Sequence, residues 1–240
     1  MRSRTELMLI EGPQAVRELL RHRAAFVRDV YLTAEAVEAH PELLTLADAA
    51  TQWVHEITPD VSQAMSGDAQ GAIAVVNQAA LTTTLPEEKE RSETYVLIAQ
   101  GRDPGNVGTI IRTADAMGAS AVLLCAGSVD VKNPKVIRSS VGSVFHLPIL
   151  TFASFEDAAH MLHLRGVGLL GTTGNDETHS LSELVISSLN GKETVLTRPH
   201  AWVMGNEARG LAPSELSICD TRIAIPMTGA AESLNVASAA

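Results

Sequence analysis

Cysteine is scarce in this sequence, since the 240 residues include only Cys125 and Cys219. Both lie among apolar residues, without the paired spacing of a zinc site or of a redox motif, so we expect buried, unreactive thiols. The sequence therefore implies neither a disulfide bond nor a bound metal ion.

Long hydrophobic runs are also missing. No apolar run approaches the roughly 18 to 20 residues that a membrane span needs, and residues 1–10 do not have the basic, apolar and small-residue regions of a signal peptide. With 45% hydrophobic residues, a chain of this length buries a substantial core. We expect a soluble, cytoplasmic protein with no membrane partner, folded as one large domain or two small ones.

Basic charge is in short supply. The chain carries 18 Lys and Arg against 28 Asp and Glu, a formal net charge of −10, whereas nucleic-acid binding depends on basic side chains that neutralise phosphates. The basic residues nevertheless cluster in two segments, Arg17, Arg21, Arg23 and Arg28 in the first and Lys132, Lys135 and Arg138 in the second. A solvated surface would explain these clusters equally well. Charge alone therefore does not indicate RNA.

A segment without apolar periodicity, residues 78–93, separates two patterned regions and predicts a domain boundary. We place domains at residues 1–80 and 94–240, joined by a linker at 81–93. In the first region, Pro13 opens a helix with Val16, Leu19 and Leu20 on one side. Further patterns predict strands at 27–32, 53–57 and 72–76 and helices at 34–50 and 61–65. This is the pattern of a small α/β domain.

The second region alternates short apolar strands with helical patterns. The expected strands are 95–99, 121–124, 167–171, 201–204 and 222–225. A helix over 154–164 begins with Ser154 and Asp157 in a capping-box spacing. Such alternation predicts a parallel sheet with helices on both faces.

A glycine-rich loop, residues 101–108, follows the first of these strands and enters a helix with an apolar stripe. Its glycines do not have the G-x-G-x-x-G spacing of a dinucleotide site, and no Lys-Ser/Thr pair follows, which excludes a P-loop. Arg112 departs from the stripe and leans toward the loop over Gly108, within reach of a ligand. The alternative is a surface ion pair between Arg112 and Asp115.

Two later loops, residues 203–211 and 225–236, also follow predicted strands. Ligands in open α/β sheets bind beyond the carboxyl ends of strands, so we expect the three loops to converge on one site. Each loop also has a simpler interpretation: Glu207 pairs with Arg209, Ser233 caps the last helix, and Asn235 satisfies backbone groups.

Taken in order, the three loops resemble the motifs of the SpoU (TrmH-like) RNA 2′-O-ribose methyltransferases of the SPOUT superfamily. The matching residues are Asn106, Gly108 and Arg112-Thr113-Ala114 in the first motif, Gly205-Asn206-Glu207 and Gly210-Leu211 in the second, and Ile225-Pro226-Met227 and Ser233-Leu234-Asn235-Val236 in the third. Residues 138–148 resemble the middle stretch of the family, and residues 11–20 resemble the start of the substrate-binding domain that often precedes it.

This resemblance implies a small N-terminal α/β RNA-binding domain and a parallel-sheet SPOUT catalytic domain with a C-terminal trefoil knot. It implies S-adenosylmethionine as cofactor, bound at Met204, Gly205, Ile225, Met227 and Leu234. It assigns catalysis to Arg112, Asn106, Glu207, Ser233 and Asn235. We expect RNA contacts at Arg17, Arg21, Arg23, Lys135 and Arg138.

The implied reaction transfers a methyl group from the cofactor to a ribose 2′-hydroxyl of RNA, and no metal is obligatory. Family analogy favours ribosomal over transfer RNA. The alternatives are a transfer-RNA methyltransferase, an RNA-binding module that has lost catalysis and, further away, a nucleotide-dependent oxidoreductase. The resemblance also implies a homodimer through the catalytic domain. The chain ends at Ala240, before the family's final helix normally ends, so we expect weakened dimerisation and cofactor binding.

Overall fold

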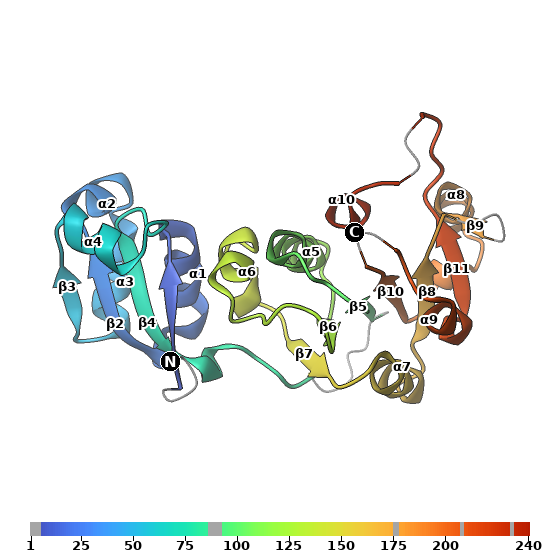
Figure 1. Cartoon of the computed structure of the whole chain (residues 1–240), viewed down its shortest axis with the longest axis horizontal. Coiled ribbons are helices and arrows are strands. Elements are labelled where there is room, and N and C mark those ends of the chain that lie inside the picture. The colour runs from blue at the N-terminus through green and yellow to red at the C-terminus, as the bar shows by residue number, and fades with distance from the viewer. Residues whose placement is uncertain (1–5, 86–92, 175–177, 207–208, 231–232) are drawn as a thin grey trace. The chain divides into compact units, whose positions relative to one another are not determined.

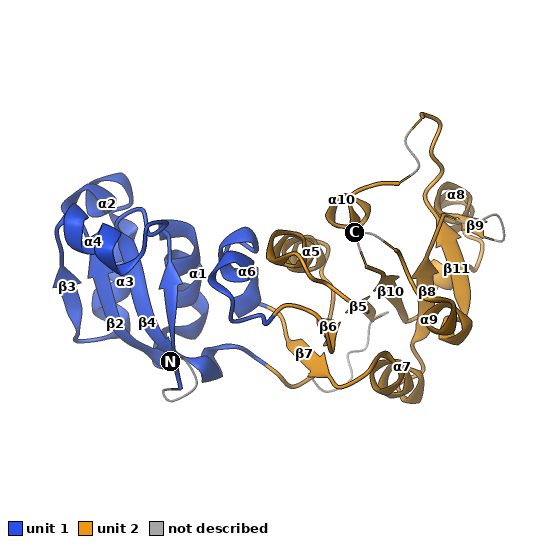
Figure 2. Ribbon diagram, viewed as in Figure 1, with its two compact units in different colours: residues 1–82, 130–146 blue, residues 83–129, 147–240 orange. Residues whose placement is uncertain are grey.

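The computed structural model describes residues 6–85, 93–174, 178–206, 209–230 and 233–240. The chain forms two compact units (Figure 2): residues 1–82 with 130–146, and residues 83–129 with 147–240. Within the described residues, no helix has both the length and the hydrophobicity of a membrane span.

The first unit contains a four-stranded mixed sheet in the order β1-β4-β2-β3. β4 pairs antiparallel with β1 and β2, and β2 pairs parallel with β3. The strands are β1 (Leu7–Glu11), β2 (Val27–Leu32), β3 (Val54–Glu56) and β4 (Ala72–Asn77). The helices are α1 (Pro13–Arg23), α2 (Ala34–Ala39), α3 (Glu42–Ala50), α4 (Pro59–Met65) and α6 (Pro134–Ser139).

The predicted helix α1 begins at Pro13, whose fixed φ suits the first helical position, and it buries Val16, Leu19 and Leu20 completely or nearly so. The prediction of a single helix over 34–50 is wrong. His40 leaves the helical region at φ −139° and ψ 67°, and α3 begins after Pro41. A proline disfavours helical backbone in the residue before it, so the segment divides into two helices there.

After the first two strands of the second unit, β5 and β6, residues 130–146 belong to the first unit, and the chain then returns to the second. They form α6 and the 3-10 turn η4 (Ser143–Phe145). Gly142, at φ +91°, precedes this turn, and an added Cβ would lie 2.6 Å from the Cβ of Glu18 on α1. Glycine at this position therefore permits both the turn and the close approach to α1. This grouping was not predicted from the sequence.

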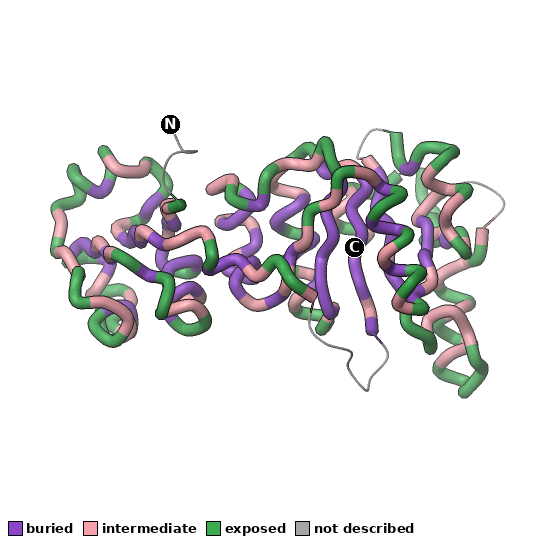
Figure 3. The backbone as a smooth tube through the Cα atoms, turned by 90° about the horizontal axis from the view of Figure 1, so that it is seen from below, coloured by how far each residue is buried: buried purple, intermediate pink, exposed green. Residues whose placement is uncertain are grey.

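The second unit contains a seven-stranded sheet among its described residues, in the order β7-β6-β5-β10-β8-β11-β9, and every pairing is parallel. Its central strands are almost wholly buried (Figure 3). The strands are β5 (Thr94–Ile98), β6 (Ala121–Cys125), β7 (Ile149–Phe152), β8 (Gly168–Thr172), β9 (His179–Ser180), β10 (His200–Met204) and β11 (Thr221–Ala224). The prediction of a parallel α/β sheet is confirmed.

Helices cover this sheet on both sides, with α5 and α7 on opposite faces (Figure 1). The helices are α5 (Pro104–Ala116), α7 (Phe155–Leu164), α8 (Leu181–Leu189), α9 (Pro213–Ile218) and α10 (Val236–Ala239). α7 packs Phe155, Ala158 and Leu162 into the core. The Ser154 hydroxyl caps α7 by accepting from the Asp157 amide at 3.0 Å, and it donates to the Asp157 carboxylate at 2.7 Å.

Candidate active site at the carboxyl ends of the strands

A cavity of about 610 Å³ lies in the second unit beside the ends of β8, β10 and β11. Its walls come from the loops that follow these strands, from side chains of β5 and β10, and from one side of α5 and α10. Such a position is the usual ligand site of a parallel sheet, because the loops at the carboxyl edge all open to the same side. The cavity volume falls in the range of small-molecule sites, about 300 to 1,000 Å³.

The loop after β10 folds back on itself in a tight turn. Asn206 and Gly210 exchange two backbone hydrogen bonds, of 3.0 and 2.8 Å, and Gly210 has φ +67°. A Cβ added at Gly205 would lie 2.3 Å from the Gly210 carbonyl carbon and 2.4 Å from the Leu211 nitrogen. Only glycine therefore fits at position 205, where the backbone lines the cavity.

The C-terminal segment is tied to the start of α5 by a pair of asparagines. Asn235 caps α10 by accepting from the Ala237 amide at 2.8 Å, and its Nδ2 donates to Asn106 Oδ1 at 3.2 Å. Asn106 is itself held at the first turn of α5, where its amide donates to the Asp103 carboxylate at 2.8 Å. Two predicted catalytic residues, 129 positions apart in sequence, are thus brought into contact.

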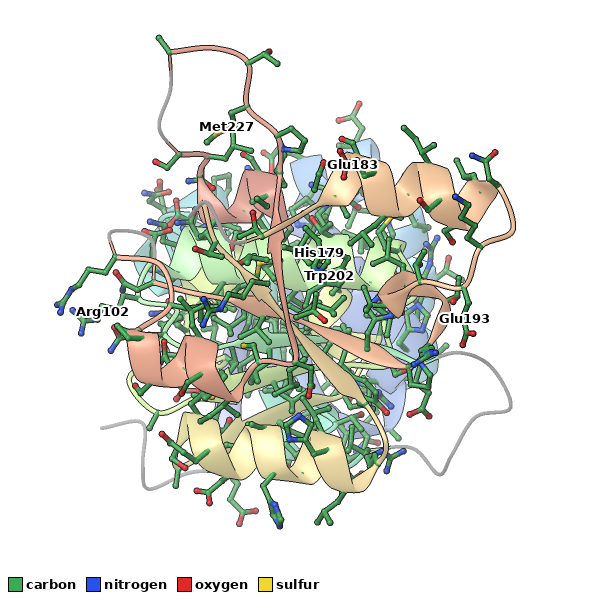
Figure 4. All side chains as sticks on the ribbon, turned by 90° about the vertical axis from the view of Figure 1, so that its right-hand side faces the viewer. Arg102, His179, Glu183, Glu193, Trp202 and Met227 are labelled. Atoms are coloured by element: carbon green, nitrogen blue, oxygen red, sulfur yellow. The ribbon has the colours of Figure 1, made fainter. Side chains whose placement is uncertain are left out.

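Apolar side chains line the cavity without being covered. Ile225, Met227 and Leu234 are 37%, 41% and 46% exposed, and all three face the cavity together with the buried Met204. Figure 4 shows Met227 on the loop that follows β11 and Trp202 on β10. All five residues predicted to bind the cofactor therefore line one cavity, and its apolar lining is suited to a flat, weakly polar group such as a purine.

The structure adds lining residues that the sequence analysis did not select as site residues. Thr172 is the last residue of β8 and Thr173 follows it, and Trp202 and Arg209 come from β10 and its loop. Thr172 Oγ1 donates to the Val203 carbonyl at 2.8 Å, which joins the ends of β8 and β10. The sequence contained a signal that could have identified Thr172 and Thr173 as site residues. They follow the predicted strand 167–171, just as the three selected loops follow their strands.

The predicted catalytic residues are not all placed at the cavity. Ser233 lines it, whereas Asn106 and Asn235 are not part of the lining. Arg112 is exposed on α5 and is not part of the lining either. The α5 residues that do line it are Ile110, Thr113, Ala114 and Met117. Glu207 lies outside the described residues.

The predicted RNA-binding residues belong to the first unit and differ in how accessible they are. Arg17 pairs with Glu42 and is only 14% exposed, and Arg23 donates to Thr82 at 2.6 Å. Arg138 pairs with both Glu11 and Asp68. Lys135 is exposed. Arg21, 51% exposed and 3.5 Å from Glu18, is the most accessible arginine of α1.

Neither cysteine lines the cavity. Burial first, and then nearby carboxylates with Glu215 foremost, raise the pKa of Cys125 to about 12. Burial likewise raises the pKa of Cys219 to about 11, helped by Asp220 and Glu215. Both thiols therefore stay protonated near neutral pH, which makes them poor nucleophiles.

Comparison with known proteins connects both units to RNA modification. Residues 93–240 match the sequence model described as the SpoU rRNA Methylase family, and residues 9–81 match the one described as RNA 2′-O ribose methyltransferase substrate binding. Among curated relatives, the chain is 32% identical over 247 residues to the 23S rRNA (guanosine(2553)-2′-O)-methyltransferase RlmP of Bacillus subtilis, covering 100% of this chain and 87% of that protein. It is 30% identical over 243 residues to the 23S rRNA (guanosine-2′-O-)-methyltransferase RlmB of Pseudomonas putida, covering 98% and 93%.

Solved structures agree with these sequence matches. The SpoU methyltransferase AviRb from Streptomyces viridochromogenes, in complex with the cofactor AdoMet, superposes with a TM-score of 0.79 at 27% identity, covering 99% of this chain and 88% of that one. An AdoMet-bound rRNA methyltransferase from Sinorhizobium meliloti superposes with a TM-score of 0.76 at 28% identity, covering 99% and 85%.

Proposed function

The chain belongs to the SpoU rRNA methylase family, and on that basis we propose that it transfers a methyl group from S-adenosylmethionine to a ribose 2′-hydroxyl of ribosomal RNA. The observation that carries this proposal is the single cavity lined by Met204, Gly205, Ile225, Met227 and Leu234. Several relatives are named for 23S rRNA, which favours ribosomal over transfer RNA as the substrate.

The cavity fits the cofactor in two respects. Its uncovered apolar side chains, Ile225, Met227 and Leu234, supply surfaces for an adenine ring. Gly205 lines the wall without a side chain, so its backbone amide and carbonyl would suit the polar edge of a purine. When bound, S-adenosylmethionine supplies an electrophilic methyl group on a sulfonium centre.

The chain's own residues would position the ribose and its hydroxyl. Asn106 and Asn235 already hold each other at 3.2 Å, so their remaining amide groups are oriented in advance. Arg112 offers a planar fork of donors that suits an RNA phosphate and hydroxyl, from the exposed side of α5. We assign it a catalytic role in the bound complex, together with Ser233 and Glu207.

RNA would be held by the first unit, and its accessible basic residues are better candidates for phosphate contacts than its buried ones. Arg21 is accessible, whereas Arg17 is mostly buried against Glu42, so its replacement would disturb folding as well as binding. A phosphate contact by Arg21 predicts that Arg21→Gln weakens RNA binding and reduces the salt slope by about 1. Arg198→Gln, which removes an exposed arginine paired with Glu193, is the matched control.

Ligand binding followed by calorimetry tests the proposal. We expect saturable binding of S-adenosylmethionine or its demethylated product and none of NAD, because the glycine spacing of a dinucleotide site is absent from residues 101–108. Transfer of a labelled methyl group to ribosomal RNA, with transfer RNA as the comparison, then identifies the substrate class. Saturable NAD binding without a response to either methyl-cycle ligand would overturn the proposal. Cofactor binding without transfer to either RNA would favour a non-catalytic RNA-binding module.

A further inference from the structure

Among the described residues, one cluster of side chains outside the cavity has the composition of a metal site. Glu18 and His22 lie one turn apart on α1, and His146 follows the turn η4 in the same unit. His22 Nε2 is 3.4 Å and His146 Nε2 is 3.2 Å from the same oxygen of Glu18, Oε2. One ligand atom from each of the three residues fits within a span of 4.8 Å.

We propose that Glu18, His22 and His146 bind a divalent transition-metal ion of the zinc class. In a tetrahedral zinc site with ligands at about 2.0 to 2.1 Å, neighbouring ligand atoms lie roughly 3.3 Å apart. The two distances between the imidazoles and Glu18 Oε2 already have this value. Two neutral imidazoles and one carboxylate leave a charge of −1, which a dication reverses, and water would complete the coordination.

The backbone explains why these three residues meet. Positions four apart on a helix lie on one face, so Glu18 and His22 are neighbours by sequence alone. His146 is 128 positions from Glu18 and reaches it because Gly142 allows its segment to approach α1 closely. The expectation of no metal site rested on cysteine spacing, which carries no information on such a distant pair.

The cluster is accessible to an ion from solution. The side chains of Glu18, His22 and His146 are 20%, 48% and 24% exposed. The rings of His22 and His146 lie 4.3 Å apart at 54°, so they are tilted rather than stacked face to face. Arg21 approaches the other carboxylate oxygen, Oε1, at 3.5 Å and leaves Oε2 directed at the imidazoles.

A bound ion would fasten residues 142–146 to α1, since its ligands come from both segments. Binding to the folded state alone raises stability, so zinc should raise the thermal midpoint of the full chain. Amide hydrogen exchange should slow at 142–146 in the same titration.

Calorimetry with zinc chloride on the full chain, without a polyhistidine tag, tests the proposal, and magnesium chloride is the comparison. We expect one zinc ion per chain and no magnesium binding, because imidazole ligands disfavour magnesium. His22→Gln and His146→Gln should each weaken zinc binding by at least about tenfold and remove the rise in thermal midpoint. His22 is half exposed, so its replacement tests binding even if His146→Gln impairs folding.

His55→Gln is the matched control, because His55 also faces a carboxylate, Asp29, at 3.2 Å but belongs to no three-residue cluster among the described residues. It should bind zinc like the unmodified chain. Absence of stoichiometric zinc binding, or zinc binding unaffected by both His22→Gln and His146→Gln, would overturn the proposal. The cluster would then be a hydrogen-bonded contact between α1 and residues 142–146.

Discussion

Among single residues, Arg112 offers a way to test catalysis separately from cofactor binding. Its side chain is exposed on α5 and does not line the cavity, so its removal leaves the cofactor-binding wall intact. We predict that Arg112→Ala lowers methyl transfer by at least about a hundredfold, a typical loss for a residue that stabilises the transition state, with cofactor affinity nearly unchanged. Single-turnover methylation at saturating cofactor and RNA measures this.

Arg112→Lys tests whether methyl transfer needs the planar guanidinium group or only its positive charge. A lysine ammonium does not reproduce two parallel donors, so we expect little recovery of the rate. Arg198→Ala, which removes an exposed arginine elsewhere in the same unit, should retain normal activity. A near-normal rate for Arg112→Ala would show that this side chain belongs to the surface alone.

At the scale of elements, the turn after β10 determines the shape of the cavity wall. Gly205→Ala would force a methyl group into the backbone of Gly210 and Leu211, which the turn relieves only by moving. We predict a loss of cofactor affinity of at least about tenfold, equivalent to roughly 1.4 kcal/mol, together with a lower thermal midpoint. Calorimetry and thermal unfolding measure the two effects.

Gly174→Ala is the control for this element. Gly174 also lines the cavity, but an added Cβ there would meet nothing within 4 Å. Its variant should keep both affinity and stability. Equal behaviour of the two variants would mean that backbone packing at Gly205 does not shape the site.

For the whole molecule, three buried or partly buried acidic groups should make the free energy of unfolding depend on pH in the alkaline range. Burial first, and then the hydrogen bond and charge of Glu93, raise the pKa of Tyr95 to about 12, and the pKa values of Cys125 and Cys219 are raised to about 12 and 11. In the unfolded chain these groups ionise near their ordinary values, 9.0 for the thiols and 10.0 for the phenol. The folded state therefore keeps protons that the unfolded state loses.

The contribution of these groups to the free energy of unfolding is fully present below about pH 9 and is lost as the pH rises toward about 12. Urea unfolding at a series of pH values should show a falling midpoint over this range. Cys125→Ala removes one of the three groups and should make the decline shallower. A midpoint that stays constant above pH 9 would contradict the prediction.

Local pattern was enough to predict most elements, and the family resemblance selected part of the cavity lining. Alternating apolar segments determined the parallel sheet, and polar loops after β5, β10 and β11 indicated its ligand edge, because these features depend only on neighbours in sequence. Pro41 was the local signal that the helix prediction overlooked. The trefoil knot and the homodimer stay predictions. The knot depends on how the chain is threaded through itself, and the homodimer depends on a second copy of the chain.

The amino-acid sequence was sufficient for the class of fold, the family and six of the residues that line the cavity, namely Met204, Gly205, Ile225, Met227, Ser233 and Leu234. The packing of the folded chain is needed to know which distant residues meet: Asn106 with Asn235, and His146 with Glu18 and His22. It also placed Arg112 away from the lining and moved residues 130–146 into the first unit. The physical reason is that these contacts depend on close backbone approaches, such as that of Gly142 to α1, which no local spacing encodes.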